Sequence, residues 1–239
     1  MLHWQLMVGL LIGIQSFCIY SAVMRIPVGL ALLLGNLAPT LLVLLTWLLG
    51  GPAPTSKAIS LMGMILCGLL FALNIPTVMA SQTSPKGQWL EGVLFGLGGA
   101  TSFAMALWVT DNRLANMDGA LRALSSMVVV FICGLVAASA DLLPGAGATP
   151  ATTNGWIAIA ALVLLYGTAF SLLFIFMPRL EISRNAPVMN AEPVAGLVLG
   201  WLILGQQLSH LQLIGGSMVI AGIVMLVYRP ATTLEVGKL

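Results

Sequence analysis

Apolar residues fill eight long stretches of the chain, and short turns rich in Gly, Pro, Ser and Thr separate them. The hydrocarbon core of a bilayer is about 30 Å thick, so a helix needs about 20 apolar residues to cross it. The pattern therefore predicts an all-α membrane protein with eight transmembrane helices. The predicted segments are residues 5–23, 27–49, 56–74, 88–110, 120–140, 156–177, 186–205 and 210–228.

Composition supports the membrane assignment. Charged residues make up only 7% of the 239 residues, whereas a soluble domain has about 25%. The net charge of +2 gives no indication of a nucleic-acid partner. The three cysteines stand singly in apolar stretches, and only two histidines exist, so no metal-ligand pattern is present. We expect a multi-pass protein of the plasma or inner membrane, with the lipid bilayer as a partner and no cofactor or metal.

The basic residues predict the orientation of the chain. With the N-terminus in the cytoplasm and alternating segments, seven basic residues lie inside and two outside. This distribution follows the positive-inside rule, so both termini are expected in the cytoplasm. The inner group is Lys57, Arg113, Arg122, Arg179, Arg184, Arg229 and Lys238, and the outer group is Arg25 and Lys86.

The chain aligns with itself at an offset of 154 residues. Asn36 then falls on Asn190 and Pro39 on Pro193, and the further matches are Arg25 on Arg179, Trp47 on Trp201 and Gly51 on Gly205. The paired segments are an odd number of helices apart and cross in opposite senses, which predicts an inverted-topology repeat as in many secondary transporters. We expect a three-helix first repeat over 1–75, a five-helix second repeat over 88–228 and a cytoplasmic tail over 229–239.

The first repeat lacks counterparts of the first two helices of the second. Two explanations stay open, either a natively reduced chain or two further helices encoded before Met1.

These features, with the stretch "MNAEPVAGLVLGWLILGQQLSHLQLIGGSMVIAGIVML", resemble the drug/metabolite transporter superfamily of EamA type. The matching residues are Pro193, Gly205, Leu208, Gln212 and Gly215. The resemblance implies a ten-helix fold and export or exchange of a small metabolite, amino-acid-like or drug-like compound by alternating access. Where the family places a glutamate after the glycine, this chain has Gln206, and the first two helices of the family pattern are absent.

Two asparagines are candidate substrate contacts. Asn36 and Asn190 each lie three residues before a proline, on the face of the helix that carries Pro39 or Pro193. A proline has no N–H and leaves the carbonyl four residues earlier without its helical partner. An open carbonyl beside an amide forms a polar site within hydrocarbon. Each asparagine either lines a cavity or merely satisfies the kink.

Glu192 and Tyr166 are further candidates. Glu192 lies about six residues, or roughly 9 Å, inside its segment, where an unpaired carboxylate is costly. It is either a contact for a substrate amine or a proton site, which would allow proton coupling, or it joins Gly196 and Gly200 in a helix-packing face. Tyr166 is in the middle of its segment rather than at an interfacial end, so a cavity position is expected.

Other function classes fit the sequence less well. The only histidine close to a membrane segment, His210, precedes Ser217 on the same helix by about 10 Å, too far for a serine-protease pair, so we expect no enzyme. No basic residue is expected in a cavity, which favours neutral, zwitterionic or cationic substrates over phosphorylated ones. A non-transporting or partner-dependent remnant of a transporter is the alternative.

The orientation is testable with reporter fusions. A reporter at Lys238 should be cytoplasmic and one at Gly145 should be on the outer side, because alternation from a cytoplasmic N-terminus places them there. An outer location of the Lys238 fusion would reverse the predicted topology.

Overall fold

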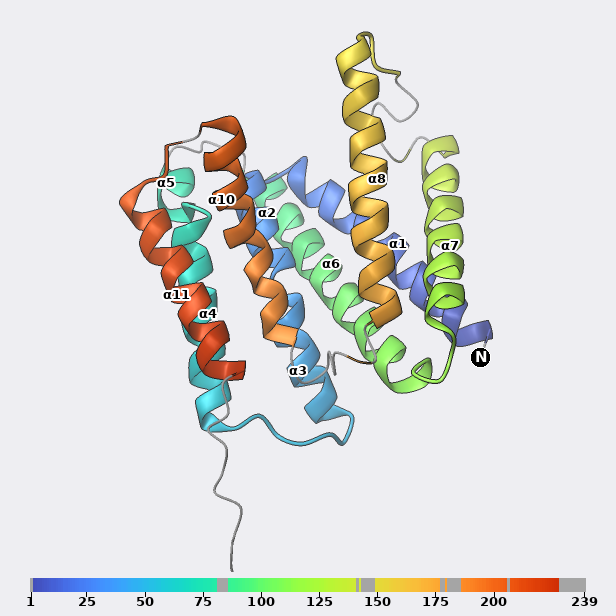
Figure 1. Cartoon of the computed structure of the whole chain (residues 1–239), viewed down its shortest axis with the longest axis horizontal. Helices are drawn as coiled ribbons and strands as arrows, with labels where there is room; N and C mark the ends of the chain where they lie inside the picture. Colours follow the sequence, from blue (N-terminus) through green and yellow to red (C-terminus); the bar gives the residue numbers. More distant parts are fainter. Residues whose placement is uncertain are drawn as a thin grey trace, which may run out of the picture.

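The computed structural model describes residues 2–80, 86–140, 142, 149–176, 179, 186–205 and 207–227, which form helices and the turns between them without any β-strand. Figure 1 shows the helices in a single bundle, with α8 extending beyond its neighbours. Their bounds are α1 Leu2–Val23, α2 Val28–Gly35, α3 Ala38–Leu48, α4 Ser56–Ala72, α5 Ile75–Ala80, α6 Lys86–Arg113, α7 Gly119–Ser139, α8 Thr153–Phe176, η2 Ala186–Asn190, α10 Ala191–Leu204 and α11 His210–Val227. The expected tail over 229–239 lies outside the described residues.

Five stretches of the described chain are long and apolar enough to span a membrane: Leu2–Val23, Val28–Leu48, Gln88–Arg113, Gly119–Ser139 and Thr153–Phe176. The apolar helices Ser56–Ala72, Pro187–Ile203 and His210–Leu226 are shorter, so their crossing stays a prediction. Two of the eight segments are interrupted. The second is divided into α2 and α3, and the seventh begins as the 3-10 turn η2 before continuing as α10.

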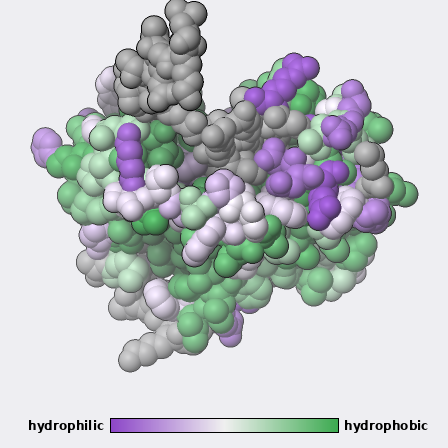
Figure 2. Space-filling view, turned by 90° about the horizontal axis from the view of Figure 1, so that it is seen from below, coloured by the Kyte–Doolittle hydropathy of each residue, from purple (hydrophilic) through white to green (hydrophobic). Residues whose placement is uncertain are grey.

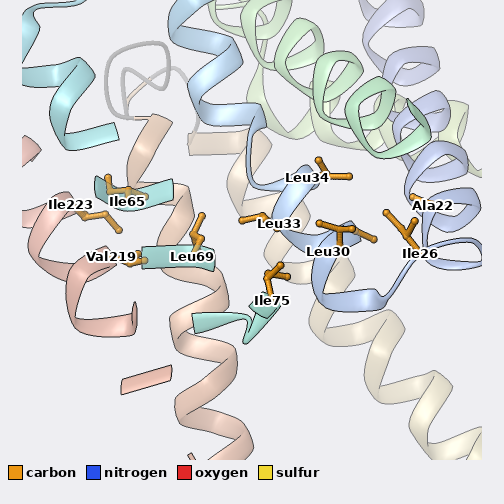
Figure 3. Packing of buried hydrophobic residues seen from close by; sticks show 11 residues of the cluster. Ala22, Ile26, Leu30, Leu33, Leu34, Ile65, Leu69, Ile75, Val219 and Ile223 are labelled. Atoms are coloured by element: carbon orange, nitrogen blue, oxygen red, sulfur yellow. The ribbon is translucent and has the colours of Figure 1, made fainter. Parts of the chain in front are cut away.

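Two hydrophobic clusters hold the bundle together. The first joins α1, α3, α6, α7 and α8 around Val8, Leu42, Leu107 and Phe174. The second joins the end of α1 with α2, α4, α5 and α11, and Figure 3 shows Ile65 and Leu69 of α4 beside Val219 and Ile223 of α11, with Leu30, Leu33 and Leu34 of α2 nearby. The most extensive helix contacts are those of α1 with α6 and of α4 with α11, so these two pairs are the centres of the two clusters.

Glycines set the closest helix contacts. A Cβ added at Gly9 of α1 would lie 2.5 Å from Cβ of Val129 in α7, closer than side-chain atoms approach. A Cβ at Gly215 of α11 would overlap the backbone N of Ala72 in α4. Small residues that bring two backbones together are typical of helix packing in membranes, where dispersion contacts replace the hydrophobic effect.

Arg122 joins three helices. It is the fourth residue of α7 and only 1% exposed, so it is not a loop residue in water as the charge pattern suggested. Its Nε donates to the Phe174 carbonyl at 3.0 Å and its Nη1 to the Leu114 carbonyl at 2.8 Å. Phe174 lies in the last turn of α8, and Leu114, whose carbonyl also accepts the Met117 N–H at 3.0 Å, directly follows α6. Both acceptors are thus at helix ends where the helix dipole is negative. The arginine therefore ties the ends of α6 and α8 to the start of α7.

Gln5 secures this junction from α1. Its Nε2 donates to the Arg122 carbonyl at 3.0 Å and to the Ser126 hydroxyl at 2.8 Å. Gln5 is 1% exposed and Ser126 is buried. A buried polar group is tolerated where it is hydrogen-bonded, so α1 is held to α7 by polar contacts as well as by packing.

The outer surface of the bundle is apolar. In α8 only 6% of the most apolar stretch is buried, against 44% in α6. In the view onto one end of the helices, Figure 2 shows hydrophilic residues gathered in patches and hydrophobic residues over much of the remaining surface. A helix that is apolar on all sides and exposed fits a membrane-embedded position.

The Arg122 junction predicts a stability effect. Arg122→Met should remove the charged donor from the buried Phe174 and Leu114 carbonyls, which costs about 3 kcal/mol. The melting temperature of the purified protein in detergent should fall by roughly 6–12 °C.

Lys57→Met is the control, because Lys57 is exposed at the start of α4. Equal melting temperatures for Arg122→Met and the parent protein would contradict the structural role of Arg122.

Candidate functional site

The first candidate feature is the break between α2 and α3. Asn36 caps the end of α2, Leu37 precedes α3, and the buried Pro39 lies in the first turn of α3. The Nδ2 of Asn36 donates to the Leu32 carbonyl one turn earlier at 2.8 Å, and the residue is half-buried. Asn36 therefore stabilises the end of α2, while its Oδ1 remains available as an acceptor among the contacts of the described residues.

The second break lies between η2 and α10. Asn190 ends η2 with helical backbone angles and is 1% exposed, and Pro193 is half-buried in the first turn of α10. The Oδ1 of Asn190 has no hydrogen-bond partner within the described part of the chain. A buried amide oxygen without a donor is costly, and such a group is typical of a site that a ligand or a water molecule completes.

The two breaks are neighbours in space. Helix α3 packs against η2, and α11 also contacts η2. The prolines explain why both segments open here, because each lacks the N–H that would continue the hydrogen-bond ladder. The structure thus brings together the elements that carry Asn36, Pro39, Asn190 and Pro193, which the sequence placed 154 residues apart.

Glu192 and Tyr166 form a second pair of candidates. Glu192 is exposed in the first turn of α10, and Tyr166 of α8 is 60% exposed. The two residues come from different helices, and the charge of Glu192 is one of the charges that act on Tyr166. Among the described residues Glu192 forms no ion pair. An accessible acidic group therefore lies on α10 and an accessible phenol on α8.

An aromatic row leads from Tyr166 into the core. The Tyr166 ring stacks on Phe170 at 5.5 Å, and Phe170 lies 4.9 Å from the ring of the fully buried Phe174. The carbonyl of Phe174 accepts a hydrogen bond from the Arg122 guanidinium. The side chain of Tyr166 is thus supported by a row that ends at the junction of α6, α7 and α8.

The helix-packing face proposed for Glu192, Gly196 and Gly200 has no close helix contact at Gly196 in the described structure. A Cβ added at Gly196 would meet nothing within 4 Å, although Gly200 is buried. Glu192 therefore does not begin a continuously packed glycine face within the described structure.

Residues of the family-like motif have structural contacts. Ser209 and Gln212 cap the start of α11 reciprocally, since the Ser209 N–H donates to Oε1 of Gln212 at 3.0 Å and the Gln212 N–H donates to Oγ of Ser209 at 3.2 Å. This arrangement is the capping box. Gly215 makes the close contact with α4 described above, Leu208 is half-buried before the helix, and Gln206 lies outside the described residues.

The sequence interpretation missed a polar pair at another place. Arg25, after α1, forms an ion pair with Glu91 of α6, with Nε and Oε2 3.1 Å apart. Glu91 is an acid within an apolar segment, so the argument applied to Glu192 could have identified it. No group of three or more His, Cys, Asp or Glu residues suited to a metal is found among the residues described here.

The comparisons with known proteins agree with this architecture. The model of the EamA-like transporter family matches residues 90–228. No curated protein matches the chain. A solved structure, described only as a crystal structure of a protein, is similar over 94% of this chain and 75% of its own chain, with a TM-score of 0.74 and 20% sequence identity, which supports the fold alone. The family match covers more than half of the sequence, and the all-helical, apolar architecture agrees with it. The chain therefore belongs to the EamA-like transporter family of the drug/metabolite transporter superfamily.

Proposed function

We propose that this membrane protein exports or exchanges a small metabolite, amino-acid-like or drug-like compound by alternating access. The observation that carries the proposal is Asn190, whose amide is buried at a helix break and whose Oδ1 is unpaired among the described residues. In a bilayer, irregular backbone is tolerated where it is buried in protein or lines a cavity. Broken helices of this kind form the substrate sites of many secondary transporters.

An inverted repeat is part of the proposal. The breaks after Asn36 and after Asn190 fall at equivalent positions at the offset of 154 residues, and the elements around them pack together. A substrate held there would lie between the two halves of the chain, near the middle of the bilayer. Movement of the cluster around α4 and α11 relative to the cluster around α1 and α6 would expose that site to alternate sides.

The charges favour neutral, zwitterionic or cationic substrates. Glu192 is accessible on α10, whereas three arginines of the bundle are engaged elsewhere. Arg122 is buried and bonded to carbonyls, Arg25 is paired with Glu91, and Arg113 lies over the rings of Trp4 and Trp108. None of these three arginines lies at the helix break, so a phosphate group held there would find no cation among them, while an amine could approach the carboxylate. Glu192 is also the candidate for proton coupling.

A second candidate function is transport that depends on a partner. Val8 and Ile12 of α1 are 0% and 2% exposed, but their counterparts at the offset of 154, Leu162 and Tyr166 of α8, are 63% and 60% exposed. The face that α6 and α7 cover on α1 is therefore open on α8. Purified chain in liposomes tests this directly, because transport by the chain alone would exclude a requirement for a partner.

The asparagines predict a transport defect without a stability defect. Asn190→Ala should lower uptake into liposomes about tenfold, since one buried hydrogen bond to substrate would be lost. The melting temperature should not fall, because Oδ1 of Asn190 has no partner in the described structure. Asn36→Ala should also reduce transport.

Asn112→Ala is the matched control for Asn36→Ala, because the Nδ2 of Asn112 also donates to a carbonyl one turn earlier, that of Trp108 at 2.9 Å. Wild-type transport by Asn190→Ala would refute the site at the helix break.

The negative charge of Glu192 is expected to affect which substrates are transported. Glu192→Gln keeps the shape and removes the negative charge, so it should leave folding intact and reduce transport of cationic relative to neutral substrates. If Glu192 also carries the proton, the dependence of transport on pH between about 5 and 8 should flatten. Asp118→Asn is the control, because asparagine also caps helices well at the start of α7. Unchanged transport of every substrate at each pH would limit Glu192 to a structural role.

A further inference from the structure

A polar cavity lies where α1 ends and α6 begins. It has a volume of about 370 Å³ and is lined by Phe17, Tyr20, Ser21, Met24, Arg25, Gln88, Glu91, Phe95 and Leu142. Arg25 follows α1 directly, and Glu91 lies just inside the span that begins at Gln88. The cavity is thus at the boundary between hydrocarbon and headgroups. The exposed Trp89 beside it is typical of this level.

The ion pair in this cavity is held in place by further contacts, but each partner keeps an atom that can form another hydrogen bond. Besides its contact with Glu91, the Arg25 guanidinium donates from Nη1 to the Ser21 carbonyl at 3.0 Å and lies 4.9 Å from the centre of the Phe95 ring. The side chains are 33% and 61% exposed. In the part of the chain that the structure describes, no contact occupies Nη2 of Arg25 or Oε1 of Glu91. One cationic donor and one anionic acceptor are therefore held side by side and face solvent or lipid.

An apolar groove continues from the cavity along α1 and α7. Its volume is about 550 Å³, and it shares Phe17, Tyr20 and Leu142 with the polar cavity. Along α1 it extends from Leu10 to Tyr20, about 15 Å at the rise of an α-helix, which equals half of a hydrocarbon core of about 30 Å. In the half of the groove that lies away from the polar cavity, α1 and α7 approach each other closely, since a Cβ at Gly13 would lie 3.1 Å from Sγ of Cys133. The groove has the length of one leaflet.

We propose that the cavity and groove together bind one phospholipid whose headgroup carries both a phosphate and a primary ammonium, as in phosphatidylethanolamine. The phosphate accepts from Nη2 of Arg25, the ammonium donates to Oε1 of Glu91, and an acyl chain lies in the groove between α1 and α7. Charge complementarity selects the headgroup, and the continuity of the polar cavity with the leaflet-long groove selects a lipid over a free solute. A soluble zwitterion would leave the groove unfilled.

Native mass spectrometry of the purified full chain tests the proposal. The protein in detergent is titrated separately with phosphatidylethanolamine and phosphatidylglycerol, and glycerophosphoethanolamine is added as a soluble headgroup competitor. We expect one retained phosphatidylethanolamine, bound about tenfold more tightly than phosphatidylglycerol, which has the phosphate but no ammonium. Equal binding of both lipids would overturn the headgroup assignment. Displacement by the soluble headgroup at matched concentration would overturn the lipid assignment.

Variants separate the two parts of the site. Arg25→Gln should weaken retention of both lipids about tenfold, whereas Glu91→Gln should abolish only the preference for phosphatidylethanolamine. Lys57→Gln, at an exposed position on α4, is the charge control. Unchanged retention by Arg25→Gln would refute the proposal.

The groove is tested by filling it. Gly134 lines the groove, and a Cβ there would meet nothing within 4 Å, so Gly134→Leu should occupy the groove without disturbing the helices and lower retention about tenfold. Gly63→Leu is the matched control, because a Cβ at Gly63 of α4 also meets nothing within 4 Å and lies away from the groove. Equal retention by the two glycine variants would show that the acyl chain does not use the groove.

Discussion

Hydrocarbon offers no hydrogen-bond partners, and the backbone of this protein is arranged to need none. Each long segment satisfies its own N–H and C=O groups as a helix, and the exceptions lie where other groups take over. At the junction of α6, α7 and α8 the Arg122 guanidinium bonds the helix-end carbonyls. At the α2–α3 break the Asn36 side chain gives the Leu32 carbonyl a second donor besides the Asn36 N–H. In the described structure two buried side-chain atoms stay unpaired, Oε1 of Gln5 in the α1–α7 contact and Oδ1 of Asn190 at the helix break.

Much of this arrangement could be predicted from the sequence, because apolar length and proline position act locally. The predicted segments correspond to apolar helices, and the interruptions occur beside Pro39 and Pro193. The burial of Arg122 could not be predicted, since a count of basic residues on each side of the membrane gives no direction for a side chain. The distance between Glu192 and Tyr166 also depends on how α8 and α10 are placed, which no spacing along the chain encodes.

The site and the family motif are largely separate. Gln212 caps α11 and Gly215 allows α11 to approach α4, so these motif residues maintain the helix pair. Tyr166, Asn190 and Glu192 lie where substrate chemistry is proposed, and none of them is among the motif residues that carry the resemblance. Membership of the family is thus readable from residues that build the fold, while most of the proposed substrate contacts are other residues.

The Arg122 junction has a consequence for biosynthesis. Arg122 is synthesised 52 residues before Phe174, whose carbonyl it binds in the finished protein. During that interval α8 does not yet exist, and the guanidinium is better solvated among the headgroups than in hydrocarbon. There the same charge can retain the start of α7 at the membrane surface, which is the cytoplasmic surface in the orientation that the basic residues predict. Arrival of α8 then supplies the missing acceptor, so a single arginine can first anchor a nascent helix and afterwards join it to its neighbours.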